Sequence, residues 1–263
     1  MYDRQIIIEH DISKLTFLTI MKIAKLRIHI APVGFEIDRI VLPAKEMRAD
    51  KVFLIQHDKP GSDKARPYVE KIKAQLKKEN ILVESIDSDR ENIFSVLKAV
   101  NDIFIAEQKN DIYVNVSSGS KIQAIACMMA CMMFKEYNVT PYYAEPDSYP
   151  ATQGKQQSNG LKNIVELPKY QIRKPKQELI EALKIIRDHN GKITKKEMAR
   201  IAEEVKLITV HSQHADQARF ASLDANIIQP LVEQWKFVEI EKIGRNRWIK
   251  ITPEGEHAAE FLI

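Results

Sequence analysis

The sequence has little of several features that would decide its class at once. Its 263 residues include two cysteines, which excludes the disulfide framework of a small secreted domain. No stretch approaches the roughly 18 uninterrupted apolar residues of a membrane span. The net charge is only +4, and residues 1–170 (24 basic, 22 acidic) and 171–263 (16 basic, 14 acidic) each carry +2. Binding to DNA must therefore come from a local patch and not from a basic tail.

A leader and a metal site are also not indicated. Acidic residues at Asp3, Glu9 and Asp11 do not fit a cleavable signal peptide, so we expect a cytoplasmic protein without a membrane partner. Cys127 and Cys131 lie four apart among methionines without further ligands nearby, which favours core packing. His211 and His214 have the spacing for one ion but no cysteine or carboxylate beside them, and we interpret them as a solvated loop. The sequence predicts no metal and no cofactor.

The stretch Asp111–Phe134 organises the N-terminal part of the chain. An apolar run, Ile112–Val116, is typical of a buried strand, and the small residues Ser117, Ser118 and Gly119 follow it. Ser120 and Lys121 then open a helix of about three turns. A strand, a tight turn and a helix place backbone N–H groups and a helix N-terminus in front of an anion. The alternative is a plain helix cap with a solvated lysine.

Other strands and helices alternate around this stretch. We predict strands at Leu26–Pro32, Lys51–Gln56, Ile81–Ile86 and Val139–Ala144, and helices at Glu36–Met47, Pro67–Lys78 and Asn92–Glu107. Pro43 is expected to kink or shorten the first helix. This alternation predicts a Rossmann-like, mostly parallel α/β sheet. Residues 145–160 form a polar loop, and Asn163–Leu167 is expected to return as an antiparallel edge strand.

The last third of the sequence follows another pattern. After a proline-bounded linker, 168–175, we expect helices at Lys176–His189, Lys195–Glu204 (capped by Thr194) and Leu223–Trp235 (opened by Ser222 and bent at Pro230). Residues 205–221 are expected to be irregular. Two strands, Phe237–Lys242 and Arg247–Thr252, then form a hairpin. Three helices and a hairpin with Arg245, Asn246 and Arg247 at its tip predict a winged helix-turn-helix domain over 176–263.

DNA binding by this domain would use the hairpin and the third helix. Lys242 and the tip residues would contact an adjacent stretch of backbone or the minor groove, while Ser222, Asn226 and Gln229 share a polar stripe on the third helix. A patch of this size makes few phosphate contacts, so two subunits on one site would be needed for tight binding. The alternative is a winged helix used for protein contact or dimerisation.

Two motifs and the domain order resemble a known family. The first motif is the turn after the first strand, which contains Gly34-Phe35-Glu36. In the second motif, Asn115, Ser117 and Lys121 fit the signature that follows the fourth strand of the CARF domain (CRISPR-associated Rossmann fold). Residues 26–167 thus resemble a CARF ligand-sensing domain, after an N-terminal extension, 1–25. The whole chain resembles archaeal CARF–winged-helix transcriptional regulators. Ser118 and Ser120 depart from the glycine or threonine of many relatives.

The resemblance implies a function. CARF domains pair as a homodimer and bind a cyclic oligoadenylate, such as cyclic tetra-adenylate, across the interface. The implied ligand-binding residues are Gly34, Phe35, Glu36, Asn115, Ser117, Ser118, Gly119, Ser120 and Lys121. The chain would then be a ligand-responsive transcriptional regulator with no catalytic residues.

Other readings stay open. One is a CARF ring nuclease that cleaves the cyclic oligoadenylate with positioned hydroxyls and Lys121. Another is a constitutive dimeric DNA-binding protein without ligand. A nucleotide-cofactor enzyme is disfavoured, because the turn at Val33–Glu36 has one glycine and not G-x-G-x-x-G.

Overall fold

A computed structural model describes residues 24–61, 63–150, 156–209 and 215–263. The chain divides into two compact units, Met1–Ile172 and Arg173–Ile263, and each is described by itself. The expected N-terminal extension, apart from residues 24 and 25, lies outside the described residues, as do His211 and His214. None of the helices in the described part of the chain combines the length and apolar character needed to cross a membrane.

The first unit is built on one six-stranded sheet with the order β3-β2-β1-β4-β5-β6. All neighbouring strands are parallel except β6, which pairs antiparallel with β5. The edge strand expected from residues 163–167 is thereby confirmed. The strands are β1 (Arg27–Pro32), β2 (Lys51–His57), β3 (Leu82–Ser88), β4 (Asp111–Asn115), β5 (Val139–Glu145) and β6 (Asn163–Glu166).

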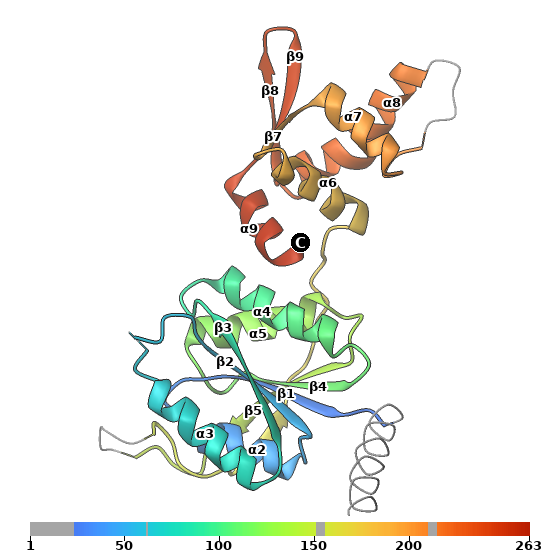
Figure 1. Cartoon of the computed structure of the whole chain (residues 1–263). Coiled ribbons are helices and arrows are strands. Elements are labelled where there is room, and N and C mark those ends of the chain that lie inside the picture. Colours follow the sequence, from blue (N-terminus) through green and yellow to red (C-terminus); the bar gives the residue numbers. More distant parts are fainter. Residues whose placement is uncertain (1–23, 62, 151–155, 210–214) are drawn as a thin grey trace, which may run out of the picture. The chain divides into compact units, whose positions relative to one another are not determined.

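Helices cover both faces of this sheet. α2 and α3 lie on one face, and α4 and α5 lie on the other (Figure 1). Their bounds are α2 (Asp38–Glu46), α3 (Arg66–Lys78), α4 (Ile93–Ala106) and α5 (Lys121–Met133). Coverage on both faces explains why the central strands are mostly apolar and do not alternate strictly with polar residues. Pro43 lies inside α2, which ends at Glu46, one residue before the expected end.

The core of this unit contains a polar pair. His29 on β1 is 1% exposed, and its Nδ1 lies 3.2 Å from the hydroxyl of buried Tyr142 on β5. The ring also stacks on Tyr113. Burial, with a smaller contribution from the nearby charge of Arg27, lowers the pKa of His29 to about 3, so this ring is neutral at physiological pH.

Cys127 and Cys131 are buried on α5, as expected for core packing. Burial raises the pKa of both thiols, that of Cys131 to about 12. They are therefore protonated and poorly nucleophilic at neutral pH.

The second unit is a winged helix with additions that the sequence pattern did not reveal. It contains α6 (Gln177–Asp188), β7 (Lys192–Thr194), α7 (Lys195–Glu204), α8 (Ala215–Leu223), β8 (Val238–Ile243), β9 (Asn246–Ile251) and α9 (Pro253–Leu262). The short strand β7 was not expected, and it pairs with β9 to make a three-stranded sheet (Figure 1). The Thr194 hydroxyl accepts from the N–H of Glu197, so the predicted cap of α7 is confirmed.

The third helix differs from its prediction. It begins at Ala215 within the stretch expected to be irregular, so Ser222 lies inside α8 and does not open a helix. Two π-helical segments continue it, η1 (Asp224–Ile228) and η2 (Pro230–Gln234). Pro230 has no N–H to donate, and i→i+5 bonds such as that from the Trp235 N–H to the Pro230 carbonyl carry the helix past it.

Candidate functional site

Two loops meet at the carboxyl edge of the first sheet, where the strand order reverses. β1 and β4 are adjacent, while the chain leaves β1 toward β2 and leaves β4 toward β5. In open α/β sheets such a switch point is where ligands bind. The loop after β1 carries Gly34, and the loop after β4 carries Ser117–Ser120. The structure thus brings the two sequence motifs together.

The contact between these loops depends on glycine. Gly119 has φ +78°, and a Cβ there would lie 2.5 Å from the Pro32 Cβ. A Cβ on Gly34 would lie 3.1 Å from the Gly119 Cα, so the two backbones are packed against each other. The Ser118 hydroxyl, which is buried, donates to the Pro32 carbonyl at 2.8 Å. Ser118 therefore fastens the loop and is not free to meet a ligand.

Asn115 and Ser117 hold the end of β4. Asn115 is fully buried, and its Nδ2 donates to the Arg39 carbonyl at 2.7 Å. Its Oδ1 accepts from the N–H of Ser117 at 2.9 Å and also from the Ser117 hydroxyl. The Ser117 oxygen in turn accepts from the N–H of Ala144 on β5 at 3.1 Å. Both side chains that fit the CARF signature here are thus engaged within the fold.

The groups at this edge that can contact a ligand are at the N-terminus of α5. The Ser120 side chain accepts from the N–H of Gln123, and the Gln123 side chain accepts from the N–H of Ser120, which forms a capping box at the start of α5. Lys121 is exposed and has no ion-pair partner among the described residues. A helix N-terminus with an unpaired lysine is electropositive and suits an anion.

In the loop after β1, the Phe35 side chain is accessible to a ligand, whereas the Glu36 side chain is buried. Phe35 is half-buried and packs edge to face on Tyr68, with ring centroids 5.5 Å apart. Glu36 is 4% exposed, and its Oε2 accepts from the N–H (3.2 Å) and hydroxyl (2.5 Å) of Ser158. Its Oε1 lies 3.7 Å from Nη1 of Arg39. Glu36 is therefore an internal anchor for the segment 156–160.

This segment is a part of the site that the sequence did not single out. The Gln156 Oε1 accepts from the N–H groups of Ile37 and Asp38 at 3.0 and 3.1 Å, and so caps α2 from outside the helix. The Asp38 carboxylate accepts from Gln156 Nε2 and from the N–H of Gly160, both at 2.8 Å. The sequence signal was only a run of Gln, Ser, Asn and Gly, which indicated a loop but not its docking place.

The wing of the second unit carries the other candidate site. Strands β8 and β9 are joined by Gly244 and Arg245, and Gly244 has φ +60° as a tight hairpin requires. Lys242, Arg245 and Arg247 are exposed and have no ion-pair partner within the described ranges. Lys250, in contrast, lies 3.1 Å from Glu239, and Glu241 lies 2.7 Å from Lys192. The glutamates of the hairpin thus pair with lysines away from its tip.

A basic cleft of about 390 Å³ extends from the wing tip to the start of α7. Arg245, Asn246 and Arg247 line one side, and Thr194, Lys195, Lys196 and Phe220 line the rest. The sequence did not assign Thr194, Lys195, Lys196 or Phe220 to a site. Phe220 was missed because α8, which carries it, begins in a stretch that was expected to be irregular. Lys195 is held by Asp224 at 2.5 Å, whereas Lys196 has no ion-pair partner in the part of the chain described.

The polar stripe on the third helix is only partly preserved. Asn226 is exposed, and its Nδ2 donates to the Ser222 hydroxyl at 3.2 Å, so these two residues lie side by side. Gln229 is exposed as well. The π-winding of Asp224–Ile228 has fewer degrees of rotation per residue, so the position of Gln229 relative to the other two does not follow a period of 3.6.

Comparison with known proteins agrees with this division. The molecule combines a mostly parallel α/β sheet with a C-terminal winged helix. Residues 27–149 match the HFX_2341_N-like, N-terminal domain family, and residues 178–263 match the DUF6293 C-terminal winged helix domain family. The first match lies within the first compact unit and the second within the other.

One curated relative is archaeal. The uncharacterized protein MJ1513 of Methanocaldococcus jannaschii is 28% identical over 206 residues, which are 67% of this chain and 61% of the relative. This chain therefore matches less than two thirds of that relative's length.

Solved structures resemble the chain more distantly. Can2 of Sulfobacillus thermosulfidooxidans, in complex with cyclic tetra-adenylate, has a TM-score of 0.40 at 12% identity, covering 90% of this chain and 63% of Can2. Csm6 of Enterococcus italicus, bound to cyclic hexa-2'-fluoro-hexa-dAMP, has a TM-score of 0.39 at 11% identity, covering 80% and 56%. VC1899 of Vibrio cholerae has a TM-score of 0.39 at 13% identity, covering 89% and 64%. These values are too low to carry a ligand or an activity over to this chain.

Proposed function

We propose that this chain is a ligand-responsive, homodimeric DNA-binding regulator. An anionic nucleotide of the cyclic oligoadenylate class binds at the β1/β4 edge, and the winged helix binds DNA. The observation that carries the proposal is the contrast at this edge between engaged and free groups. Asn115, Ser117 and Ser118 are held inside the fold, while the start of α5 is exposed at Lys121, which has no ion-pair partner in the described ranges of the chain.

The ligand class follows from what this edge offers. Backbone N–H groups and one lysine per chain suit phosphates, which are bound well by oriented donors at a helix N-terminus. The half-buried Phe35 supplies an aromatic ring beside them, on which a base can stack. The adenylate assignment comes from the resemblance of Asn115, Ser117 and Lys121 to the CARF signature.

A homodimer is supported by the outer face of α5. Ile122 is 37% exposed and Ile125 is 54% exposed, and half-buried Met129 lies on the same stripe one turn further on. The stripe starts next to Lys121, so pairing of two α5 helices would bring two lysines to one ligand. A cyclic tetra-adenylate with four phosphates would then bridge the two subunits.

The DNA-binding half rests on the cations of the wing and cleft. Lys196, Lys242, Arg245 and Arg247 have no ion-pair partners in the described chain and can neutralise phosphates. Each subunit makes few such contacts, so a symmetric site read by two subunits is expected. A ligand that shifts the dimer fully between two forms must bind one of them about 10⁴-fold more tightly.

Calorimetric titration of the full-length protein with cyclic tetra-adenylate tests the sensor. We expect one ligand per dimer, and at least about tenfold weaker binding for Lys121→Ala, because loss of a charge-assisted contact costs about 1.5 kcal/mol or more. Lys77→Ala is the matched control, since Lys77 is an exposed lysine in the last turn of α3. Equal affinity in wild type and Lys121→Ala would overturn the placement of the ligand at Lys121. No heat with any cyclic oligoadenylate would overturn the ligand class.

Fluorescence anisotropy with DNA from the region upstream of the chain's own gene tests the other half. Binding should weaken steeply with salt, and Arg245→Ala with Arg247→Ala should lower the slope of log affinity against log salt by about 2. The control is Lys184→Ala on α6, an exposed lysine outside the wing. An unchanged slope in the double variant would place DNA binding, if any, away from the wing.

A further inference from the structure

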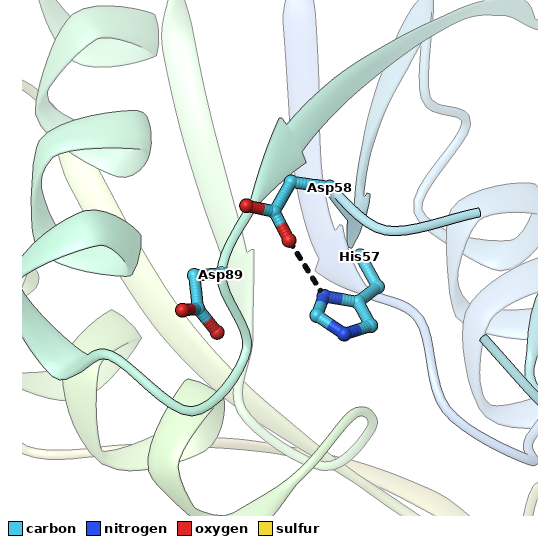
Figure 2. Close-up of side chains that lie close together, drawn as sticks. All are labelled: His57, Asp58 and Asp89. Atoms are coloured by element: carbon cyan, nitrogen blue, oxygen red, sulfur yellow. Dashed lines mark ion pairs between the residues drawn. The ribbon is translucent and has the colours of Figure 1, made fainter. Parts of the chain in front are cut away.

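A cluster of metal-ligating side chains lies at the same carboxyl edge, one strand away from the switch point. His57 is the last residue of β2 and pairs in register with Ser88, the last residue of β3. Asp58 and Asp89 directly follow these two residues. Parallel pairing therefore brings both aspartates next to one imidazole, as Figure 2 shows.

The distances suit ligands of one ion. One ligand atom from each of His57, Asp58 and Asp89 lies within 4.8 Å of the others. The Nδ1 of His57 is 2.9 Å from Oδ1 of Asp58, yet this buried nitrogen has no hydrogen-bond partner of good geometry. Two neighbouring ligands that share an ion at about 2.1 Å stand about 3.0 Å apart at a right angle and about 3.4 Å apart at a tetrahedral angle, without a hydrogen bond between them. The contact thus has the spacing of two ligands and lacks the alignment of a donor and an acceptor.

The surroundings hold these groups in place. His57 is 9% exposed, and Asp58 donates its N–H to the Ser88 carbonyl at 3.2 Å. Asp89 accepts from the N–H of Glu91 at 2.9 Å through one carboxylate oxygen, which leaves the other for a ligand. Hydrogen bonds of this kind orient the ligands of a metal centre.

We propose that His57, Asp58 and Asp89 bind one divalent transition-metal ion of the Zn²⁺ or Mn²⁺ type. Imidazole favours transition metals over Mg²⁺ and Ca²⁺, and two carboxylates balance the charge of a divalent ion. Three protein ligands leave further positions for water. The proposal does not depend on the cyclic nucleotide.

The ion would stiffen the turn between β3 and α4. Arg90 follows Asp89 directly, its guanidinium pairs with buried Asp63, and its carbonyl accepts from the Ser120 hydroxyl at 3.5 Å. A metal bound by Asp89 therefore fixes a segment that touches the start of α5.

Titration of chelator-treated, full-length protein with Co²⁺ and Zn²⁺ tests the site. The visible absorption of Co²⁺ reports its ligands, and calorimetry with Zn²⁺ gives the affinity and stoichiometry. We expect one ion per chain, and at least about tenfold weaker binding for Asp89→Asn and for His57→Gln. Melting temperature should rise with Zn²⁺ in wild type and not in Asp89→Asn.

Controls separate this site from other ligands of the chain. Asp102→Asn, at an exposed carboxylate near Lys98 on α4, should bind metal as wild type does. His211→Gln with His214→Gln tests the histidines outside the described residues. Circular dichroism checks that each variant is folded, and Asp58→Asn, at a more exposed ligand, replaces any variant that is not. Binding that survives loss of His57 and Asp89, or that is lost with His211 and His214, would overturn the proposal.

Discussion

The sheet edge and the wing differ in how their polar side chains are exposed and hydrogen-bonded. At the edge, the side chains of Asn115, Ser118 and Glu36 are buried and satisfied by internal hydrogen bonds. At the wing, Lys242 and Arg247 are exposed and form no ion pair with any residue that the structure describes. The edge is thus a rigid scaffold that presents backbone groups and Lys121, whereas the wing presents the side chains themselves. Substitutions of the buried side chains at the edge should therefore act on stability, and substitutions of Lys121 or of the wing cations should act on binding.

The largest effect is expected at Asn115. Asn115→Ala removes a buried donor and acceptor and leaves the Arg39 carbonyl and the Ser117 N–H without their partner, which costs about 3 kcal/mol of unfolding free energy. Urea denaturation measures it. Lys121→Ala on the same edge should change stability by less than about 0.5 kcal/mol. Equal losses in both variants would remove the distinction between scaffold and ligand groups.

Two glycines with positive φ sharpen the comparison further. Gly119→Ala should cost about 3 kcal/mol, because a left-handed φ is strained and the new Cβ meets Pro32. Gly244→Ala at the wing tip should cost only about 1 kcal/mol, since a Cβ there meets nothing within 4 Å. The difference between the two, measured by thermal unfolding, reports how tightly the edge is packed. A larger loss at Gly244 would contradict it.

The buried His29 makes the first unit sensitive to acid. Its pKa is lowered to about 3 in the fold, while the unfolded chain takes up the proton near pH 6.5. Stability is therefore full above about pH 6.5 and falls by about 1.4 kcal/mol for each pH unit below it, or about 2 kcal/mol at pH 5. Denaturation of wild type and His29→Gln from pH 7.5 to 5 measures this slope. The variant should show a flatter dependence, and parallel curves would refute the role of His29.

The smallest effect separates paired from unpaired lysines of the hairpin. Lys242→Ala should reduce the salt slope of DNA binding by about 1, because a free cation is lost. Lys250→Ala should reduce it less, since Lys250 is paired with Glu239. Anisotropy titrations at several salt concentrations compare the two. A greater effect at Lys250 would show that the ion pair opens on DNA.

Much of the fold followed from local pattern. Apolar runs between small-residue turns predicted the sheet, and Thr194 as an N-cap predicted the start of α7. The start of the third helix was misplaced because its first turns lack an apolar period, and Pro230 suggested a bend where π-helical winding continues the helix. The strand β7 is too short for periodicity to indicate.

The site was predicted in outline only. The sequence placed Ser117–Lys121 at the sheet edge, but residue types do not show whether a side chain is engaged or free. The role of Gln156 depends on a contact across more than a hundred residues, and that of His57 with Asp89 depends on the register of β2 and β3. Such pairings are fixed by tertiary structure and leave no local signal.

The cap that Gln156 places on α2 helps to determine which helix N-terminus a phosphate can bind. Of the helices that begin at this edge, α2 follows β1 and α5 follows β4, the two strands of the switch point, and both have N-terminal dipoles of the same sign. At α2, the amide oxygen of Gln156 accepts hydrogen bonds from two backbone N–H groups, and the adjacent Asp38 carboxylate repels an anion. At α5, the cap comes from neutral Ser120 and Gln123, and Lys121 follows at once. The N-terminus of α2 is therefore occupied by the Gln156 amide and disfavours an anion. The N-terminus of α5 carries Lys121 and favours one.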